Sequence, residues 1–253
     1  MKLRMRILLL SLCCMTTVLS LPTAKASSVL ASSFADKLTH GQFLLQLGAF
    51  NMSNQGKPQQ INIQDLIGDY FSVSSGQNQN ALVGLGYFID GQTYNRWNLL
   101  YGIDAFYLMQ TTVSGKVTQE QLFTNLSYSY DVTNTPVYAT VKGLYDLNDR
   151  YHVTLDLGAG PNFMKTSGFS EQSLDGGVTV GDQIFSSKNN VTFSAMAGIG
   201  VRMDHVIEQL PVECGYHLFY LGRGEFNTKT NQVLNTLKTG NSYAQSLSCG
   251  IVV

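Results

Sequence analysis

The sequence predicts an all-β fold, an eight-stranded antiparallel up-and-down transmembrane β-barrel. Three observations support this prediction. Apolar and polar residues alternate strictly in segments that recur along the chain, which is typical of strands with one apolar face. Only 13% of the 253 residues are charged, compared with roughly 25% in ordinary soluble domains. The connections between these segments are alternately short and long, as in outer-membrane barrels.

The first residues of the chain have the order of a secretory signal. Three basic residues precede a short apolar run, and residues 24–26 (Ala-Lys-Ala) supply small side chains at the two positions that signal peptidase reads. We predict a cleavable signal peptide over residues 1–26, cut between Ala26 and Ser27, and a short N-terminal segment over 27–40. An uncleaved anchor helix is the alternative, which the short apolar run disfavours.

Composition excludes several classes of protein. Removing the signal peptide leaves 12 basic and 17 acidic residues, a net charge of −5. Nucleic acid is therefore not an expected partner, because no basic face remains to neutralise phosphates. A mean hydropathy of +0.01 is too low for a helical membrane protein, so only a barrel of strands could span a bilayer.

Two segments show the strand pattern most clearly. From Arg96 to Met109 every odd position is apolar or aromatic, and the segment from Val191 to Met203 repeats this pattern. Helical spacing would not sort the residues in this way. The other six strands are predicted near residues 43–49, 81–89, 122–147, 151–160, 213–220 and 246–253.

The connection lengths predict the orientation of the barrel. The short connections are residues 90–93, 148–149 and 204–211, and the longer ones are 51–80, 111–121, 165–190 and 227–241. Outer-membrane barrels have short periplasmic turns and long external loops. We therefore expect both termini of the barrel, residues 41–253, on the periplasmic side, which requires an even number of strands.

Alternation alone does not say which face points outward, so a soluble lipocalin-like barrel is the alternative. The polar faces are mostly Gly, Ser, Thr and Asn, whereas a water-facing exterior would carry many Lys and Glu residues. We therefore predict that the apolar face meets lipid and that the polar face lines a narrow lumen. The predicted polar lumen residues are Asp104, Lys142, His152, Asp156, Arg202, Glu213, His217 and Arg223.

Three segments within the predicted strands, 157–160 (Leu-Gly-Ala-Gly), 197–201 (Ala-Gly-Ile-Gly-Val) and 215–222, carry a family resemblance. The chain resembles the small outer-membrane β-barrels of the opacity type and the OmpA- or OmpX-like surface antigens. The resemblance implies an outer-membrane location with loops at the cell surface, contact with membrane lipid and lipopolysaccharide, and assembly by the barrel assembly machinery. It does not imply one activity. Such barrels usually end in an aromatic residue, whereas this chain ends in Ile-Val-Val.

The sequence offers little that points to catalysis. It contains no Ser-His-Asp spacing, phosphate loop or Cys-His metal spacing, so we predict no enzymatic activity, cofactor or metal. The charged lumen residues are expected to pair with one another, because an unpaired charge in a confined space is costly. A catalytic or metal cluster in the lumen is the alternative interpretation.

Cys214 and Cys249 are the two cysteines of the predicted mature chain. Both lie on the lipid-facing register of the last two strands, where a symmetric hairpin would place them opposite one another. A cross-strand disulfide near the periplasmic rim is one possibility, because oxidation is permitted there. Two free thiols are the other, because cross-strand geometry is often strained.

We expect the function to lie in the four long loops, whose Asn, Gln, Ser, Gly and Lys content suits a hydrated surface. Loop 51–80 is unusually apolar; it could fold over the barrel mouth, extend the sheet, or contact an extracellular or host partner. The leading expectation is a structural or surface-interaction protein of the adhesin or antigen kind. A narrow passive pore for small or apolar solutes and a lipid-modifying barrel enzyme are the alternatives; eight strands leave room mainly for side chains.

Overall fold

The computed structural model describes residues 41–74 and 77–253, which belong to the compact unit Lys37–Val253. The predicted signal peptide (1–26), its cleavage site and the segment up to residue 40 lie outside the described residues. The described part of the chain contains no helix that is long and apolar enough to cross a membrane.

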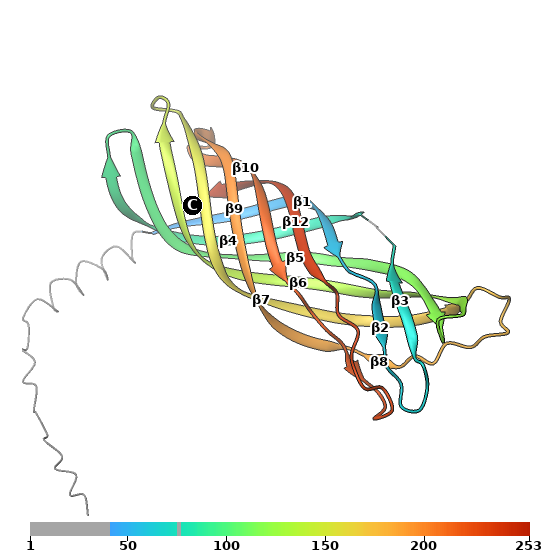
Figure 1. Cartoon of the computed structure of the whole chain (residues 1–253). Helices are drawn as coiled ribbons and strands as arrows, with labels where there is room; N and C mark the ends of the chain where they lie inside the picture. Colours follow the sequence, from blue (N-terminus) through green and yellow to red (C-terminus); the bar gives the residue numbers. More distant parts are fainter. Residues whose placement is uncertain (1–40, 75–76) are drawn as a thin grey trace, which may run out of the picture. The chain divides into compact units, whose positions relative to one another are not determined.

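Eight antiparallel strands close into a ring (Figure 1). They are β1 (Gln42–Gln55), β4 (Gln77–Tyr94), β5 (Trp97–Gln119), β6 (Phe123–Asp146), β7 (Tyr151–Ser173), β9 (Lys188–Ile207), β10 (Leu210–Gly222) and β12 (Asn241–Val252). Four short strands lie in the connections: β2 (Gln59–Ile61), β3 (Asp69–Val73), β8 (Phe185–Ser186) and β11 (Asn227–Thr228). Each strand of the ring pairs with its neighbours in chain order, and β1 pairs with β12 to close it. The predicted fold class is confirmed.

The closing pair of strands brings the first and last residues of the barrel to the same side of the molecule. β1 and β12 pair from Leu44 opposite Val252 to Gln55 opposite Asn241, and two backbone hydrogen bonds of 2.7 and 2.8 Å join Phe43 to Val253. The short β4–β5, β6–β7 and β9–β10 turns lie at this same end, which we call the turn end. The opposite end, with the longer connections, is the loop end. A closed ring satisfies the backbone polar groups without a free sheet edge, as lipid requires.

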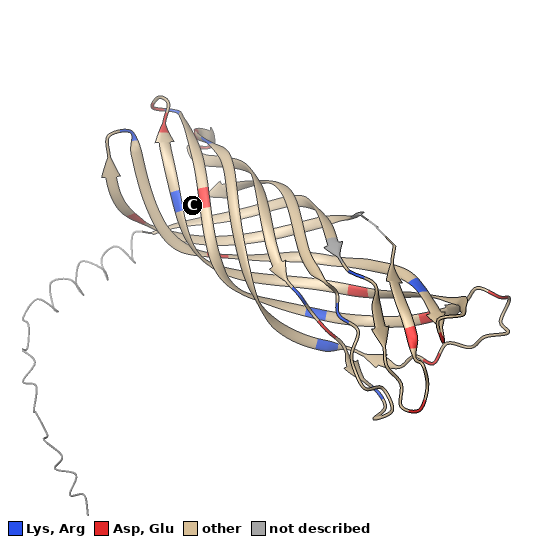
Figure 2. Ribbon diagram, in the orientation of Figure 1, with Lys and Arg blue, Asp and Glu red and all other residues tan. Residues whose placement is uncertain are grey.

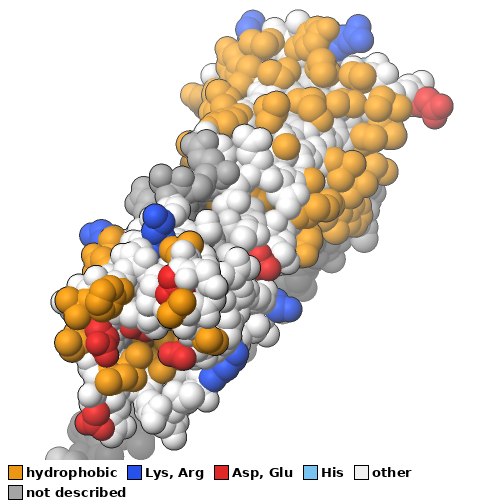
Figure 3. All heavy atoms as spheres, turned by 90° about the vertical axis from the view of Figure 1, so that its right-hand side faces the viewer, with side chains coloured by type: hydrophobic (Ala, Val, Ile, Leu, Met, Phe, Trp, Pro, Cys, Tyr) orange, Lys and Arg blue, Asp and Glu red, His pale blue; other side chains and the backbone are white. Residues whose placement is uncertain are grey.

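An apolar belt covers the outer face of the ring toward the turn end (Figure 3). Leu157 is 66% exposed and Ile103 is 59% exposed, values that are unusual for such side chains. The other members of the belt include Phe43, Leu45, Leu47, Leu85, Tyr107, Leu155, Phe193, Ile199, Leu218, Tyr243 and Leu247. Soluble monomers rarely expose so large a contiguous apolar surface, so the belt is the lipid-facing surface of the barrel.

Three strands extend far beyond this belt at the loop end (Figure 1). β5, β6 and β7 have 23, 24 and 23 residues, whereas β12 has 12. At about 3.3 Å per residue the difference corresponds to roughly 35 Å of strand. The prediction of loops over 111–121 and 165–190 is therefore wrong over much of both ranges, because residues 111–119 and 165–173 continue β5 and β7.

A β-bulge explains why the sequence pattern concealed the continuation of β5. The register between β5 and β6 shifts between Leu108 and Thr111, and both Met109 and Gln110 are exposed. Even-numbered residues face inward before the bulge and odd-numbered residues after it, so Val113 is buried. One extra residue in a strand moves the side chains that follow to the opposite face, which inverts the alternation.

The apolar loop 51–80 extends the sheet, one of the three possibilities that its sequence left open. β3 pairs with β5 from Asp69 opposite Gln119 to Val73 opposite Gly115, and β2 pairs with β3. The extension contributes side chains to the interior of the loop end, where Phe71 is fully buried.

Buried apolar and aromatic side chains fill the interior toward the loop end; we call them the loop-end core. Their rings contact one another across the barrel, with centroid distances of 5.2 Å for Phe106 and Phe219 and 5.0 Å for Tyr130 and Phe226. The core also includes Phe50, Met52, Ile61, Phe71, Leu82, Leu108, Tyr128, Tyr138, Met164, Phe185, Met196 and Leu237. The prediction of a lumen lined mainly by small polar residues is therefore wrong for this part of the barrel.

A pair of arginine substitutions on one strand tests the position of the lipid belt. Ile103→Arg places a charge on the apolar belt and should lower the free energy of unfolding by about 2–4 kcal/mol. Ser114→Arg is the matched control, because Ser114 is exposed on the same strand above the belt and the substitution should change little. The measurement is urea-induced unfolding in phospholipid vesicles. Equal effects of the two substitutions would contradict the assignment.

Candidate functional site

The barrel interior contains a cluster of buried charged residues on four strands. Asp104 on β5, Lys142 on β6, Asp156 on β7, and Glu213 and His217 on β10 all point inward and are at most 7% exposed. These five residues form the lumen cluster. Alternation places each of them on the inner face, since its neighbours in the chain point to the other side of the sheet.

Lys142 lies at the centre of the lumen cluster. Its Nζ forms an ion pair with Glu213 and lies 3.2 Å from Oδ1 of Asp156. Nε2 of His217 lies 3.5 Å from the other carboxylate oxygen of Asp156, and the ring of Phe88 lies 5.0 Å from Nζ. Opposite charges thus pair across the lumen, which offsets the cost of removing them from water.

Two glycines make room for the lumen cluster. A Cβ atom at Gly86 would lie 2.5 Å from Oδ1 of Asp104, and a Cβ atom at Gly198 would lie 2.4 Å from Cδ2 of His217. These distances are shorter than any tolerable contact. The small residues in the polar pattern of the sequence therefore leave space for the larger charged side chains of neighbouring strands.

Removing the central cation tests the role of the lumen cluster. Lys142→Met should lower the free energy of unfolding by about 3–5 kcal/mol, because the carboxylates of Asp156 and Glu213 would remain buried without their partner. Arg150→Met is the control, since Arg150 is exposed in the β6–β7 turn. Urea-induced unfolding followed by tryptophan fluorescence measures both. A Lys142→Met barrel as stable as the control would show that the cluster contributes little.

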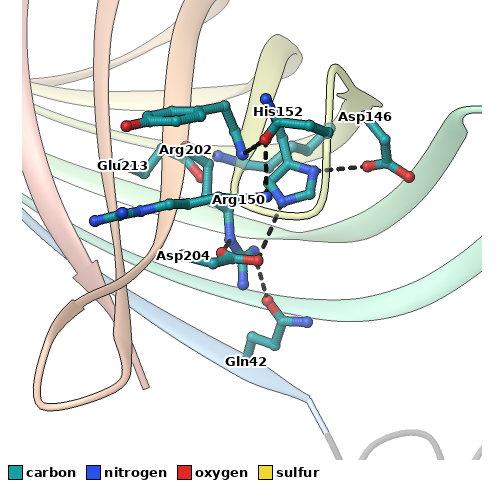
Figure 4. Close-up of polar contacts among 10 residues, drawn as sticks. Gln42, Asp146, Arg150, His152, Arg202, Asp204 and Glu213 are labelled. Carbon is teal, nitrogen blue, oxygen red and sulfur yellow. Dashed lines mark hydrogen bonds and ion pairs between the residues drawn. The ribbon is translucent and has the colours of Figure 1, made fainter.

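A second polar cluster lies at the turn end, around His152 (Figure 4). Nδ1 of His152 lies 2.7 Å from Asp146, and Nε2 lies 3.1 Å from Asp204. Arg202 lies 3.3 Å from Asp204 and donates a hydrogen bond of 2.9 Å to Oε1 of Gln42. These five residues form the turn-end cluster. Both ring nitrogens of His152 thus contact a carboxylate.

The turn-end cluster lines a cavity of about 310 Å³. Beyond it toward the lumen cluster lie the buried side chains of Leu44, Phe88, Leu100, Leu144 and Val252, which form a small apolar layer. A hydrolase of the Ser-His type needs a nucleophile beside the histidine. Among the described residues, the lining of this cavity includes neither serine nor cysteine. Within the same part of the chain, no group of three or more His, Cys, Asp or Glu residues could hold a metal ion.

The predicted lumen residues fall into three groups. Asp104, Lys142, Asp156, Glu213 and His217 meet in the lumen cluster, whereas His152 and Arg202 belong to the turn-end cluster. The placement of Arg223 in the lumen is wrong. It follows the last residue of β10 and is exposed at the loop end, because β10 stops at Gly222.

Sequence reasoning missed three members of the turn-end cluster, Gln42, Asp146 and Asp204. Asp204 was assigned to a turn, although β9 continues to Ile207 and the alternation gives Asp204 the same face as Arg202. Asp146 is the last residue of β6, and Gln42 is the first residue of β1. Extending the alternation to the strand ends would have included all three.

Cys214 and Cys249 are bonded to one another, with an S–S distance of 2.11 Å. They are directly opposite residues of β10 and β12, and their Cα atoms are 4.0 Å apart. Of the two states that the sequence left open, the structure contains the disulfide. It links the two shortest strands of the ring, outside the lumen.

The closed ring, the apolar belt, the buried interior charges and the short turns at one end define the class. The chain is an integral β-barrel of the small bacterial outer-membrane type. Its fold agrees with the resemblance noted in the sequence.

The chain matches no protein-family model and no curated protein. Its fold is similar to that of the outer-membrane protein OprG from Pseudomonas aeruginosa (12% identity, 84% of this chain and 96% of that chain, TM-score 0.47). It is also similar to Ail, the attachment invasion locus protein of Yersinia pestis (13% identity, 84% of this chain and 99% of that chain, TM-score 0.36). A third similar structure is the outer membrane protease OmpT from Escherichia coli (9% identity, 84% of this chain and 95% of that chain, TM-score 0.44). At these identities and scores the likenesses concern the fold and assign no activity to this chain.

Proposed function

We propose that this protein is a non-conducting outer-membrane barrel that binds a macromolecular partner outside the cell through the tip of its loop end. The observation that carries the proposal is a group of exposed apolar side chains far from the lipid belt. Leu122 and Phe123, in and after the β5–β6 turn, are 69% and 66% exposed, and Leu66 and Ile67, between β2 and β3, are both 59% exposed. With Tyr70 they form what we call the distal tip.

The distal tip is a continuous surface. Leu66 and Phe123 line the same cavity of about 200 Å³, and Tyr70 lies opposite Thr118 on the pairing of β3 with β5. Water surrounds this part of the molecule, so the exposed apolar side chains have no lipid to cover them. Exposed apolar patches on the water-facing part of a protein typically mark interaction sites.

Acidic residues surround the apolar side chains of the distal tip. Asp69, Glu120 and Asp182 line the same cavity as Leu66 and Phe123. Burial raises the pKa of Asp69, and the nearby charges of Asp182 and Glu120 also raise it, against a backbone hydrogen bond from Glu120 that lowers it. A partner with apolar side chains flanked by Lys or Arg would cover the patch and compensate these carboxylates.

The loop-end core supports the non-conducting part of the proposal. Its aromatic rings contact one another across the interior, and the apolar layer around Phe88 lies between the lumen cluster and the turn-end cluster. Interior side chains fill small barrels of this strand number. A hydrated path through such an interior would need many rings to move, which disfavours a passive pore.

Planar-bilayer recording tests whether the lumen conducts. The reconstituted barrel should show no defined unitary conductance, because the loop-end core and the apolar layer around Phe88 occupy the lumen. An open porin reconstituted in the same membrane is the positive control. Reproducible ohmic steps from the purified barrel would contradict the proposal and favour the pore.

Substitution of the distal tip tests partner binding. Leu66→Ser, Ile67→Ser and Phe123→Ser together should lower adhesion of barrel-producing cells to extracellular-matrix proteins and cultured epithelial cells at least about tenfold, because apolar anchors contribute much of the binding energy. Tyr94→Ser is the matched control, since Tyr94 is 74% exposed at the turn end. The proposal fails if the triple variant adheres as well as the unsubstituted protein, or if the unsubstituted protein adheres to none of these surfaces.

A further inference from the structure

A basic cleft lies at the loop end, where β9 passes the end of β10. The cleft has a volume of about 340 Å³, and its charged lining residues are Lys188, Arg223, Glu225 and Lys238. Figure 2 shows basic segments gathered in this region, where β7 and β9 pass the end of β10. Asn189, Asn190 and Thr192 complete its polar lining.

The unequal lengths of β9 and β10 create this cleft. β10 pairs with β9 only as far as Tyr220 opposite Ala195, whereas β9 continues to Lys188 beside β7. The chain that follows β10 then leaves the barrel wall. It is held by hydrogen bonds of 2.9 Å from Thr166 Oγ1 and 3.1 Å from Asn190 Nδ2 to the carbonyl oxygen of Glu225.

The cleft carries an excess of positive charge. Lys188 forms an ion pair with Glu225, and Lys238 is joined to Glu225 by a β-bridge. The hydrogen bond from Lys188 lowers the pKa of Glu225, and the charges of Lys188, Lys238 and Arg223 lower it further. With three cations and one carboxylate, the cleft has a net charge of +2. This is unusual in a chain whose predicted mature form has more acidic than basic residues.

An apolar trough lies on the outer face of the same strands, nearer the turn end. Its volume is about 450 Å³, and its outward-facing apolar lining residues are Ala195, Ala197, Leu218, Tyr220 and Tyr243. Two alanines beside larger side chains produce the depression. Ala195 follows Val191 of the basic cleft by four residues, so roughly 13 Å of β9 separates them.

A row of aromatic residues lies along the edge of the apolar trough that is nearer the basic cleft. The ring of Tyr220 on β10 lies 6.5 Å from that of Phe193 on β9 and 5.4 Å from that of Tyr243 on β12. Aromatic rows of this kind occur at the interface between lipid and water. The basic cleft therefore lies at the level of the lipid headgroups, and the trough lies at the level of the acyl chains.

We infer that the basic cleft and the apolar trough together bind one lipid molecule of the outer leaflet. This lipid is phosphorylated and carries several acyl chains, and lipopolysaccharide is a lipid of this kind. Arg223 and the two lysines hold the headgroup phosphate through charge-assisted hydrogen bonds, and an acyl chain lies in the trough. A zwitterionic lipid would leave the excess charge of the cleft uncompensated, and free phosphate would leave the trough unused. The inference rests on the membrane position of the barrel and not on the distal tip.

Native mass spectrometry of the full barrel in detergent tests this inference. The probes are lipid A, enzymatically dephosphorylated lipid A, phosphatidylcholine and inorganic phosphate. We expect one lipid A molecule to remain bound, at least about tenfold weaker retention of the dephosphorylated form and of phosphatidylcholine, and no competition from inorganic phosphate. Equal retention of the phosphorylated and dephosphorylated forms would overturn the inference, as would displacement of lipid A by inorganic phosphate.

Two sets of variants locate the lipid on the barrel. Arg223→Gln with Lys238→Gln should weaken lipid A retention about tenfold, and Ala197→Leu, which fills the trough, should also weaken it. The matched control, Lys57→Gln with Lys116→Gln, removes two exposed charges from the loop end outside the cleft. A heat-modifiability gel confirms that each variant is folded. Unchanged retention in folded Arg223→Gln/Lys238→Gln protein, or an equal loss in the control, would contradict the site.

Discussion

The structure depends on one constraint, that a backbone in lipid must satisfy its hydrogen bonds within the protein. Ring closure between β1 and β12 meets this requirement. It also separates two surfaces. The outer face must be apolar because it contacts lipid, and the inner face holds the remaining side chains, which include the polar and charged ones. Beyond the belt the constraint ends, and the strands are free to differ in length. That freedom produces both the distal tip and the basic cleft.

The strand pattern allowed the ring to be predicted from the sequence because alternation is a direct consequence of strand geometry. All eight strands, the ends of the barrel and the opposition of Cys214 to Cys249 follow from it. The same rule failed where a single extra residue interrupted the period, as between Leu108 and Thr111. Arg223 was misplaced because no pattern indicates where β10 leaves the wall. The basic cleft could not be predicted, since its residues come from separate chain segments.

The interior is organised in layers that differ in chemistry. The turn-end cluster is followed by an apolar layer, then by paired charges around Lys142, then by the loop-end core. The paired charges lie between apolar surroundings, so they have few ways to rearrange without losing a partner. Such an interior favours a rigid barrel wall. A rigid wall suits the binding that we propose at the distal tip.

The disulfide has a consequence for how the ring can close. β12 is the last strand of the barrel and pairs with β10 on one side and with β1 on the other. A shift of one residue in this strand would turn its apolar side chains into the lumen and its polar side chains toward lipid. The bond between Cys214 and Cys249 excludes such a shift on the β10 side. The pair of β10 and β12 therefore reaches the seam with β1 in a fixed register.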